Sequence, residues 1–311
     1  MNTSKYTLIF TIVLIILTSC SGGTTSSSLS TYSSPPTTSQ PKPANFVVAS
    51  IIPPQAATNA GTPAPVSVVV SNTGEVGGSS SVILKVNGVD YSAQDVTLAP
   101  GESKTVVFQV TEPKQGNYIL ASGSVTASMS VTQLPMIQAT LRLADLPAGF
   151  TPISYAEMGV DLSILSSQFG GNKSDWFGFA NTGSPSTFCF IFGLNMYPLT
   201  TLQQVSFDSD MIVYQVNPAK AIQDFESGFG STFTSYEILT SLSKIGDKSL
   251  GLRCHLSESG INFILDVVMF RVADTVTVYY QMWIDGTGFN LPSETFVKLI
   301  ESRIKAVVAS R

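Results

Sequence analysis

The sequence feature that most constrains the fold is a series of short segments in which apolar residues recur at every second position. Such segments span residues 66–70, 82–86 and 106–110, and turn-forming residues such as Asn87-Gly88 separate them. A period of two is that of a β-strand with one buried face, and Asn-Gly is a strong hairpin signal. Several short strands at this spacing predict an antiparallel β-sandwich over residues 46–132.

The turns of this segment carry a more specific resemblance. Asn72-Thr73-Gly74, Asn87-Gly88, Pro100-Gly101-Glu102 and Gly116 follow one another between strands such as VSVVV and KTVVFQV. In this order they resemble the CARDB family, immunoglobulin-like modules of bacterial and archaeal surface proteins that are named for cell adhesion. The resemblance implies an immunoglobulin-like fold, display at a surface and contact with other proteins, often as a spacer, and it assigns no site.

Residues 135–311 combine strand and helix patterns. Consecutive strands are expected at 249–256, 261–272 and 275–285, with Ala273-Asp274 as the turn of the last hairpin. The other expected elements are a helix over 158–169, a hairpin over 176–194, a strand at 212–216, a helix from Pro218 and a final helix that Ser293 caps. Together they predict an α+β domain with an antiparallel sheet and about three helices. The tract 245–249, the hairpin and the last helix diffusely resemble sensor-like domains of bacterial lipoproteins.

The first 45 residues have a different composition. Lys5 precedes an apolar run over 8–17, which is shorter than the roughly 20 residues that a membrane-spanning helix needs. The run ends at Leu17-Thr18-Ser19-Cys20, and this arrangement resembles a bacterial lipoprotein signal peptide with its lipobox. The resemblance implies removal of residues 1–19 and acylation of Cys20 with palmitate-like chains. The alternative is a secretory signal that happens to contain a cysteine.

An acylated Cys20 would anchor the protein at the extracytoplasmic face of the cell membrane, at the cell surface or on the periplasmic side. Each buried methylene contributes about 0.8 kcal/mol, so two or three chains give stable anchoring. Residues 20–45 are rich in Ser, Thr and Pro and are expected to form a disordered tether.

Composition limits the partners and the redox chemistry. The net charge is −5 and only 12% of residues are charged, without a basic block, which argues against a nucleic-acid partner. Cys189 and Cys254 remain once Cys20 is acylated, and an even number in an oxidising compartment predicts one disulfide. Two separate buried thiols are the alternative.

Few residues suggest catalysis or metal binding. His255 is the single histidine, and its neighbour Cys254 points to the opposite face of the expected strand. Asp208 and Asp210 would lie on one face of a strand and could contact a cation, although a solvated edge explains them better. We therefore expect no metal, no cofactor and no catalytic residue. Carboxylates that a hydrolase could use are Glu157, Asp161, Asp175 and Glu226.

An aromatic and polar strand face is the best candidate for a binding surface. Tyr279, Gln281 and Trp283 alternate along the last strand, and Trp176 lies in another aromatic segment. The alternative is that a helix covers this face. The sequence thus predicts a non-catalytic, membrane-anchored lipoprotein that presents a binding or adhesion domain on a stalk to a protein or a small molecule. A hydrolase of envelope polymers and a structural subunit of an envelope complex remain alternatives.

Overall fold

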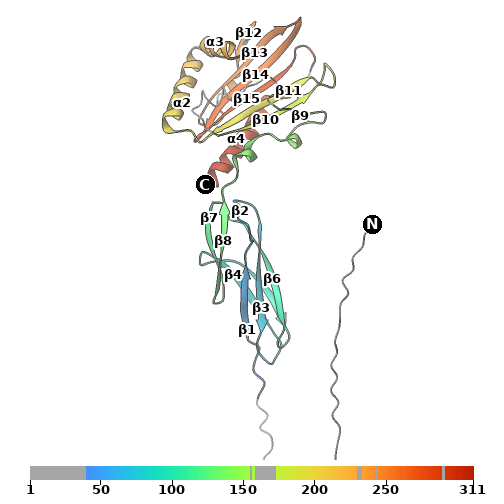
Figure 1. Ribbon diagram of the computed structural model, residues 1–311, viewed down its shortest axis with the longest axis vertical. Helices are drawn as coiled ribbons and strands as arrows, with labels where there is room; N and C mark the ends of the chain where they lie inside the picture. The colour runs from blue at the N-terminus through green and yellow to red at the C-terminus, as the bar shows by residue number, and fades with distance from the viewer. Residues whose placement is uncertain (1–39, 155, 158–172, 230–232, 243, 289–290) are drawn as a thin grey trace, which may run out of the picture. The chain divides into compact units, whose positions relative to one another are not determined.

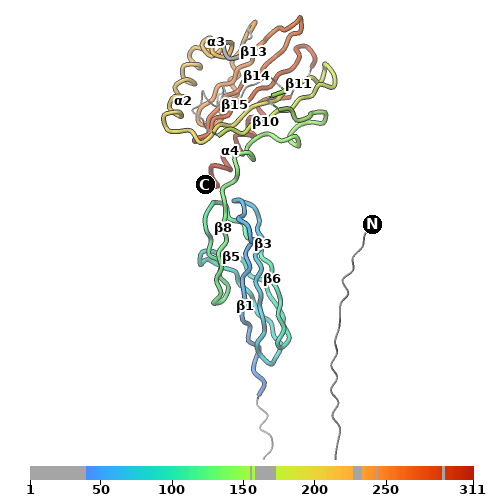
Figure 2. The backbone as a smooth tube through the Cα atoms, in the orientation of Figure 1, coloured from blue at the N-terminus to red at the C-terminus, as the bar shows by residue number. Residues whose placement is uncertain are grey.

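The computed structural model describes residues 40–154, 156–157, 173–229, 233–242, 244–288 and 291–311. The first eight strands form an immunoglobulin-like sandwich of two sheets, with orders β1-β3-β6 and β2-β8-β7-β4-β5. Its strands are β1 (Phe46–Ile52), β2 (Thr58–Asn59), β3 (Ala64–Asn72), β4 (Gly78–Val86), β5 (Val89–Leu98), β6 (Ser103–Val110), β7 (Gly116–Ser122) and β8 (Val125–Thr132). β1, β3 and β6 lie side by side in the backbone trace (Figure 2). The alternating apolar residues point into one core, as the sequence predicted.

The turn after β3 fixes the position of the segment that precedes β1. Asn72 is fully buried, and its Oδ1 accepts hydrogen bonds from the backbone N–H groups of Asn45 and Gly74, each at 3.0 Å. Its Nδ2 donates to the carbonyl oxygen of Val76 at 2.8 Å. A Cβ on Gly74 would lie 2.1 Å from the carbonyl oxygen of Pro43, so only glycine fits there. The Asn-Thr-Gly turn is therefore a packing element of this fold.

A seven-stranded antiparallel sheet follows, with the order β12-β13-β14-β15-β11-β10-β9. The strands are β9 (Thr151–Pro152), β10 (Lys173–Asn181), β11 (Cys189–Tyr197), β12 (Ser235–Ile238), β13 (Lys248–Glu258), β14 (Ile261–Val272) and β15 (Thr275–Ile284). The helices within the described residues are α2 (Thr201–Val216), α3 (Pro218–Phe229) and α4 (Ser293–Ala309), with short 3-10 turns at η1 (Met136–Ala139), η2 (Leu143–Asp145) and η3 (Thr240–Leu242). The strands expected at 176–194, 249–256, 261–272 and 275–285 are all present.

Helices cover both faces of this sheet and enclose two cores. α4 packs on one face through Phe296, Ile300 and Ile304, and α2 and α3 pack on the other (Figure 1). The final helix confirms the sequence prediction of a helix at the end of the chain. Within the described residues, no helix combines the length and the apolar character needed to cross a bilayer.

The strand expected at 212–216 is wrong, because these residues are the last turns of α2. Thr200 starts the helix: its side chain accepts from the backbone N–H of Gln203, and the Gln203 side chain accepts from the Thr200 N–H. Phe207 and Met211, four residues apart, then bury one face against the sheet. Of the alternating residues, Ile212 and Val216 are exposed, whereas Tyr214 is half-buried and donates its hydroxyl hydrogen to Asp224 at 2.8 Å.

Two further local predictions are wrong, one on α2 and one on α4. Asp208 and Asp210 do not share a face as they would on a strand; Asp208 forms an ion pair with Arg271 at 2.7 Å, and Asp210 is exposed. The described residues hold no cluster of three His, Cys, Asp or Glu side chains fit for a metal. At the last helix, Pro292 occupies the cap position in place of Ser293, whose hydroxyl points into the protein.

The predicted disulfide is also wrong. Cys189 and Cys254 are free and fully buried, one in the core under α4 and the other in the core under α2 and α3. β15 and β14 separate their strands, so the Cα atoms are about three strand spacings, or ~14 Å, apart. A disulfide needs Cα atoms that lie less than about 7 Å apart. The signal peptide, Cys20 and the helix expected at 158–169 lie outside the described residues.

Candidate functional site

A buried carboxylate organises the sheet at the start of α4. Asp266 on β14 is 1% exposed and accepts two hydrogen bonds from Arg253, which lies opposite it on β13. The distances are 2.7 Å from Arg253 Nε to Asp266 Oδ1 and 3.0 Å from Nη2 to Oδ2. This bidentate geometry is the strong form of a charge-assisted pair. The bond to Asp266 raises the pKa of Arg253, so the guanidinium stays charged.

Neutral groups complete this network below the helix. The Ser293 hydroxyl donates to Asp266 Oδ2 at 2.6 Å, and its oxygen lies 2.9 Å from Gln281 Oε1. Tyr279 donates its hydroxyl hydrogen to Gln281 Oε1 at 2.6 Å, and Gln281 Nε2 donates to the carbonyl oxygen of Leu291 at 2.8 Å. Complete burial raises the pKa of Tyr279 well above its usual value. The network therefore joins β14 and β15 to the segment that leads into α4.

The outer edge of this network is exposed to solvent. Arg253 Cζ lies 5.3 Å from the centre of the half-buried Trp283 ring, within the range of a cation–π contact. Glu237 on the edge strand β12 approaches Arg253 Nη1 at 3.5 Å. His255, two residues further along β13, is half-buried and shares this face. We call Glu237, Arg253, His255 and Trp283 the Arg253–Trp283 surface.

The predicted binding face is only partly available. Tyr279 and Gln281 are fully buried, because α4 covers this part of the sheet, so the prediction that they form an exposed surface is wrong. Trp283 lies beyond the start of α4 and stays accessible. Trp176 belongs to the opposite face, where its ring stacks on Phe192 at 5.9 Å. The structure does not bring the two tryptophans together.

Arg253 and Asp266 were missed by the sequence reasoning, although a signal for them exists. Ser259 and Gly260, both with positive φ, form a two-residue turn between β13 and β14. Such a turn fixes the register of a hairpin, and counting outward from it places Arg253 opposite Asp266. Opposite charges at directly paired positions of a sheet indicate a stabilising pair.

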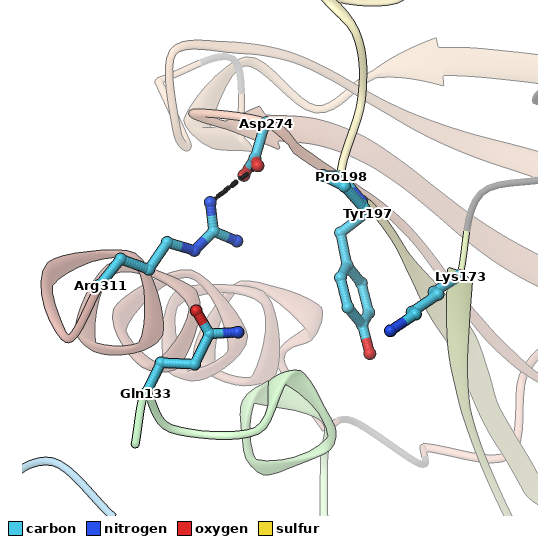
Figure 3. Close-up of a pocket in the computed structure, with 6 residues that line it drawn as sticks. All are labelled: Gln133, Lys173, Tyr197, Pro198, Asp274 and Arg311. Atoms are coloured by element: carbon cyan, nitrogen blue, oxygen red, sulfur yellow. Dashed lines mark hydrogen bonds and ion pairs between the residues drawn. The ribbon is translucent and has the colours of Figure 1, made fainter. Parts of the chain in front are cut away.

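A polar pocket of about 300 Å³ opens elsewhere on this fold. It is lined by Gln133, Lys173, Tyr197, Pro198, Asp274 and Arg311 (Figure 3). Arg311 Nη1 donates to both carboxylate oxygens of Asp274 at 2.7 Å, and Tyr197 and Lys173 form the other side. Among the described residues that line this pocket, Asp274 is the one carboxylate. This described lining therefore contains one carboxylate, whereas most glycosidases use a pair.

The carboxylates considered for hydrolysis have local partners. Glu157 accepts from the backbone N–H of Ser154 at 2.7 Å, and Glu226 accepts from the backbone N–H of Phe233 at 2.8 Å. Asp175 accepts from the Tyr197 hydroxyl at 2.6 Å. Asp161 lies outside the described residues.

Comparison with known protein families gives a match for residues 43–132. The CARDB family model matches residues 43–132, which include the predicted segment 46–132. The comparison with curated proteins returns no match. Among solved structures, a CARDB domain from Pyrococcus furiosus in complex with di-metal ions is 25% identical over 28% of this chain and 93% of that chain, with a TM-score of 0.26.

Two further solved structures, a CARDB domain and a β-glucosidase, are similar to part of this chain. A solution structure of the Pyrococcus furiosus CARDB domain is 24% identical over 29% of this chain and 95% of that chain, with a TM-score of 0.26. A β-glucosidase from Erythrobacter marinus is 19% identical, with a TM-score of 0.27, and the match covers 29% of this chain and 16% of the enzyme. The assignment depends on the family model and concerns the sandwich only. Residues 43–132 of this chain are a CARDB domain.

Proposed function

We propose that this chain is a lipid-anchored protein of the extracytoplasmic face of the membrane and that it binds a partner through residues 135–311. The CARDB domain suggests a binding or adhesion-type module. The lipobox-like sequence at Cys20 and the Ser/Thr/Pro tract support anchoring and a stalk. In this proposal the CARDB domain acts as a spacer or an adhesion module, and no step is catalytic.

The observation that carries the proposal is the fixed position of Arg253 over Trp283. A partner that contacts this pair does not have to order the arginine, because Asp266 already holds it with two hydrogen bonds. Arginine and tryptophan are also the residue types that most often dominate binding energy in protein interfaces. The surface favours a protein partner that stacks an apolar side chain on Trp283 and places a polar acceptor near Arg253.

A site-specific cross-linker tests the proposed surface. The photoreactive amino acid p-benzoylphenylalanine replaces Trp283 in the full-length chain, produced in intact cells, and irradiation captures what lies against it. The matched control carries the same amino acid in place of Trp176, the tryptophan on the opposite face of the sheet. Tryptophan fluorescence and thermal melting establish that both variants fold.

The two positions should give different results. We expect a discrete adduct from position 283 and none from position 176. Equal adducts from both positions would mean that the contact is not specific to the Arg253–Trp283 surface. The lack of any adduct from position 283 would refute binding there.

A further inference from the structure

The outer face of α2 exposes apolar side chains on both sides of a central serine, Ser209. It exposes Leu202 (82%), Val205 (58%), Ile212 (49%), Val213 (48%) and Val216 (82%). At 3.6 residues per turn these five side chains fall within an arc of about 100°. The opposite side of the helix holds the buried Phe207 and Met211. The helix thus carries two apolar faces, and only one of them contacts the sheet.

The spacing of the exposed face is that of a helix–helix seam. Positions 202, 205, 209, 212 and 216 alternate steps of three and four, as a and d positions do in a coiled coil. Ser209 lies at the centre, seven residues from Leu202 and seven from Val216. Its hydroxyl donates to the carbonyl oxygen of Val205 at 2.8 Å, so covering this serine leaves no donor without a partner.

We propose that a second copy of this chain docks on α2, with the two helices antiparallel about a twofold axis at Ser209. Leu202 of one copy then packs against Val216 of the other, and Val205 packs against Ile212. The small side chain at the centre allows the helices to approach closely. The seam is self-complementary because its apolar positions lie at nearly equal distances on both sides of Ser209, which a twofold interface requires.

Charge favours a second copy over a lipid surface as the occupant. α2 contains Asp208 and Asp210 and neither lysine nor arginine, whereas helices that lie on membranes carry basic residues on their polar face. Beside the seam, Asp208 is paired with Arg271 through hydrogen bonds of 2.8 and 2.7 Å, and the exposed Asp210 lies on the other flank of the helix, about 60° outside the apolar arc. Asp208 therefore brings no unpaired carboxylate to the contact between two copies.

The area of the seam sets the strength of the association. At these exposed fractions the five side chains present roughly 500 Å² of apolar surface, near the upper end for a monomeric protein. Two copies would bury roughly 1,000 Å² in total, at the lower limit for a specific interface. We infer a reversible dimer.

Cysteine cross-linking in membranes tests the contact directly. The full-length Ser209→Cys variant is oxidised in the membranes of the cells that produce it and is examined by non-reducing electrophoresis. The matched control is Ser302→Cys on α4, because Ser302 is also exposed on a helix and also donates to a nearby carbonyl, that of Leu299, at 2.8 Å. The native Cys189 and Cys254 are buried and give no background in a folded chain, and any product from Cys20 is common to both variants.

Ser209→Cys should form a dimer of twice the 33.0 kDa chain mass, less any removed leader, at least tenfold faster than Ser302→Cys. Adding Val205→Asp, an exposed change, should abolish this product while the melting temperature stays within a few degrees. Equal rates for the two cysteine variants, an unaffected product in the Val205→Asp background, or a cross-link only to a different protein would each overturn the proposal. These results do not depend on the Arg253–Trp283 surface.

Discussion

The most demanding test of the described site is the removal of Arg253. The Arg253→Ala variant leaves the Asp266 carboxylate, which is 1% exposed, without its cationic partner. The Ser293 hydroxyl at 2.6 Å is then the main donor to this charge. Breaking a buried ion pair in this way costs about 3 to 5 kcal/mol, because a charge remains in a site that water does not reach.

Other ion pairs of the same fold provide a graded comparison. Asp274 is 21% exposed, so Arg311→Ala leaves a carboxylate that water can reach, and we expect a loss of about 1 kcal/mol. The Lys220–Asp224 pair is 47% and 40% exposed, and Lys220→Ala should cost about 0.3 to 0.5 kcal/mol. The three losses in free energy of unfolding should therefore fall in the order of carboxylate burial.

Tryptophan fluorescence in a urea titration suits this test. The chain has two tryptophans, Trp176 and Trp283, and both belong to the seven-stranded sheet, so their signal reports on that part of the chain. The urea concentration at the midpoint of unfolding should be well below those of the other two variants for Arg253→Ala, and the slope of the unfolding free energy against urea concentration should be unchanged. A loss below 1 kcal/mol for Arg253→Ala, equal to that for Arg311→Ala, would refute the burial of Asp266 on which the site depends.

Three further predictions concern packing. The denatured, unreduced chain should show reactive thiols at Cys189 and Cys254. In the native chain, burial and nearby carboxylates raise the pKa of Cys254 to about 12, so alkylation of this thiol should stay slow up to about pH 10. One disulfide and no free thiol in the denatured chain would contradict this. Gly74→Ala should destabilise the sandwich by about 2 kcal/mol or more in calorimetry, since the new methyl group would collide with Pro43, and an unchanged transition would contradict the described turn. In urea titrations, Tyr279→Ala should lower the free energy of unfolding by about 3 to 5 kcal/mol, and Tyr279→Phe should lower it by about 1 kcal/mol. Small and similar losses for both variants would mean that the Tyr279 side chain is exposed.

The sequence predicted well where one local signal dominated. The strands at 261–272 and 275–285 follow from alternation and from the turn at Ala273-Asp274, which the structure forms with a positive φ at Ala273. The start of α3 at Pro218 follows from the preference of proline for the first turn of a helix. The CARDB turns around Asn72 are specific because their polar groups and glycine are each needed in the packing.

Prediction failed where the outcome depended on a distant neighbour. Alternation placed Tyr279 and Trp283 on one face, but only α4, which begins at Ser293, decides that the first is buried and the second is not. At 212–216, local β-branched residues outweighed a capping box that lies more than ten residues earlier in the chain, at Thr200. The cysteine count favoured a disulfide without regard to the sheet between the two thiols.

Mass spectrometry of the native N-terminus tests the central claim, that lipid holds this protein at a membrane. The full-length chain is extracted from the membranes of cells that produce it, beside a Cys20→Ala variant. We expect the wild-type product to begin at Cys20 with acyl chains attached, and the Cys20→Ala variant to carry no lipid. A wild-type product that begins at Met1, or that carries Cys20 without any acyl chain, would contradict the account.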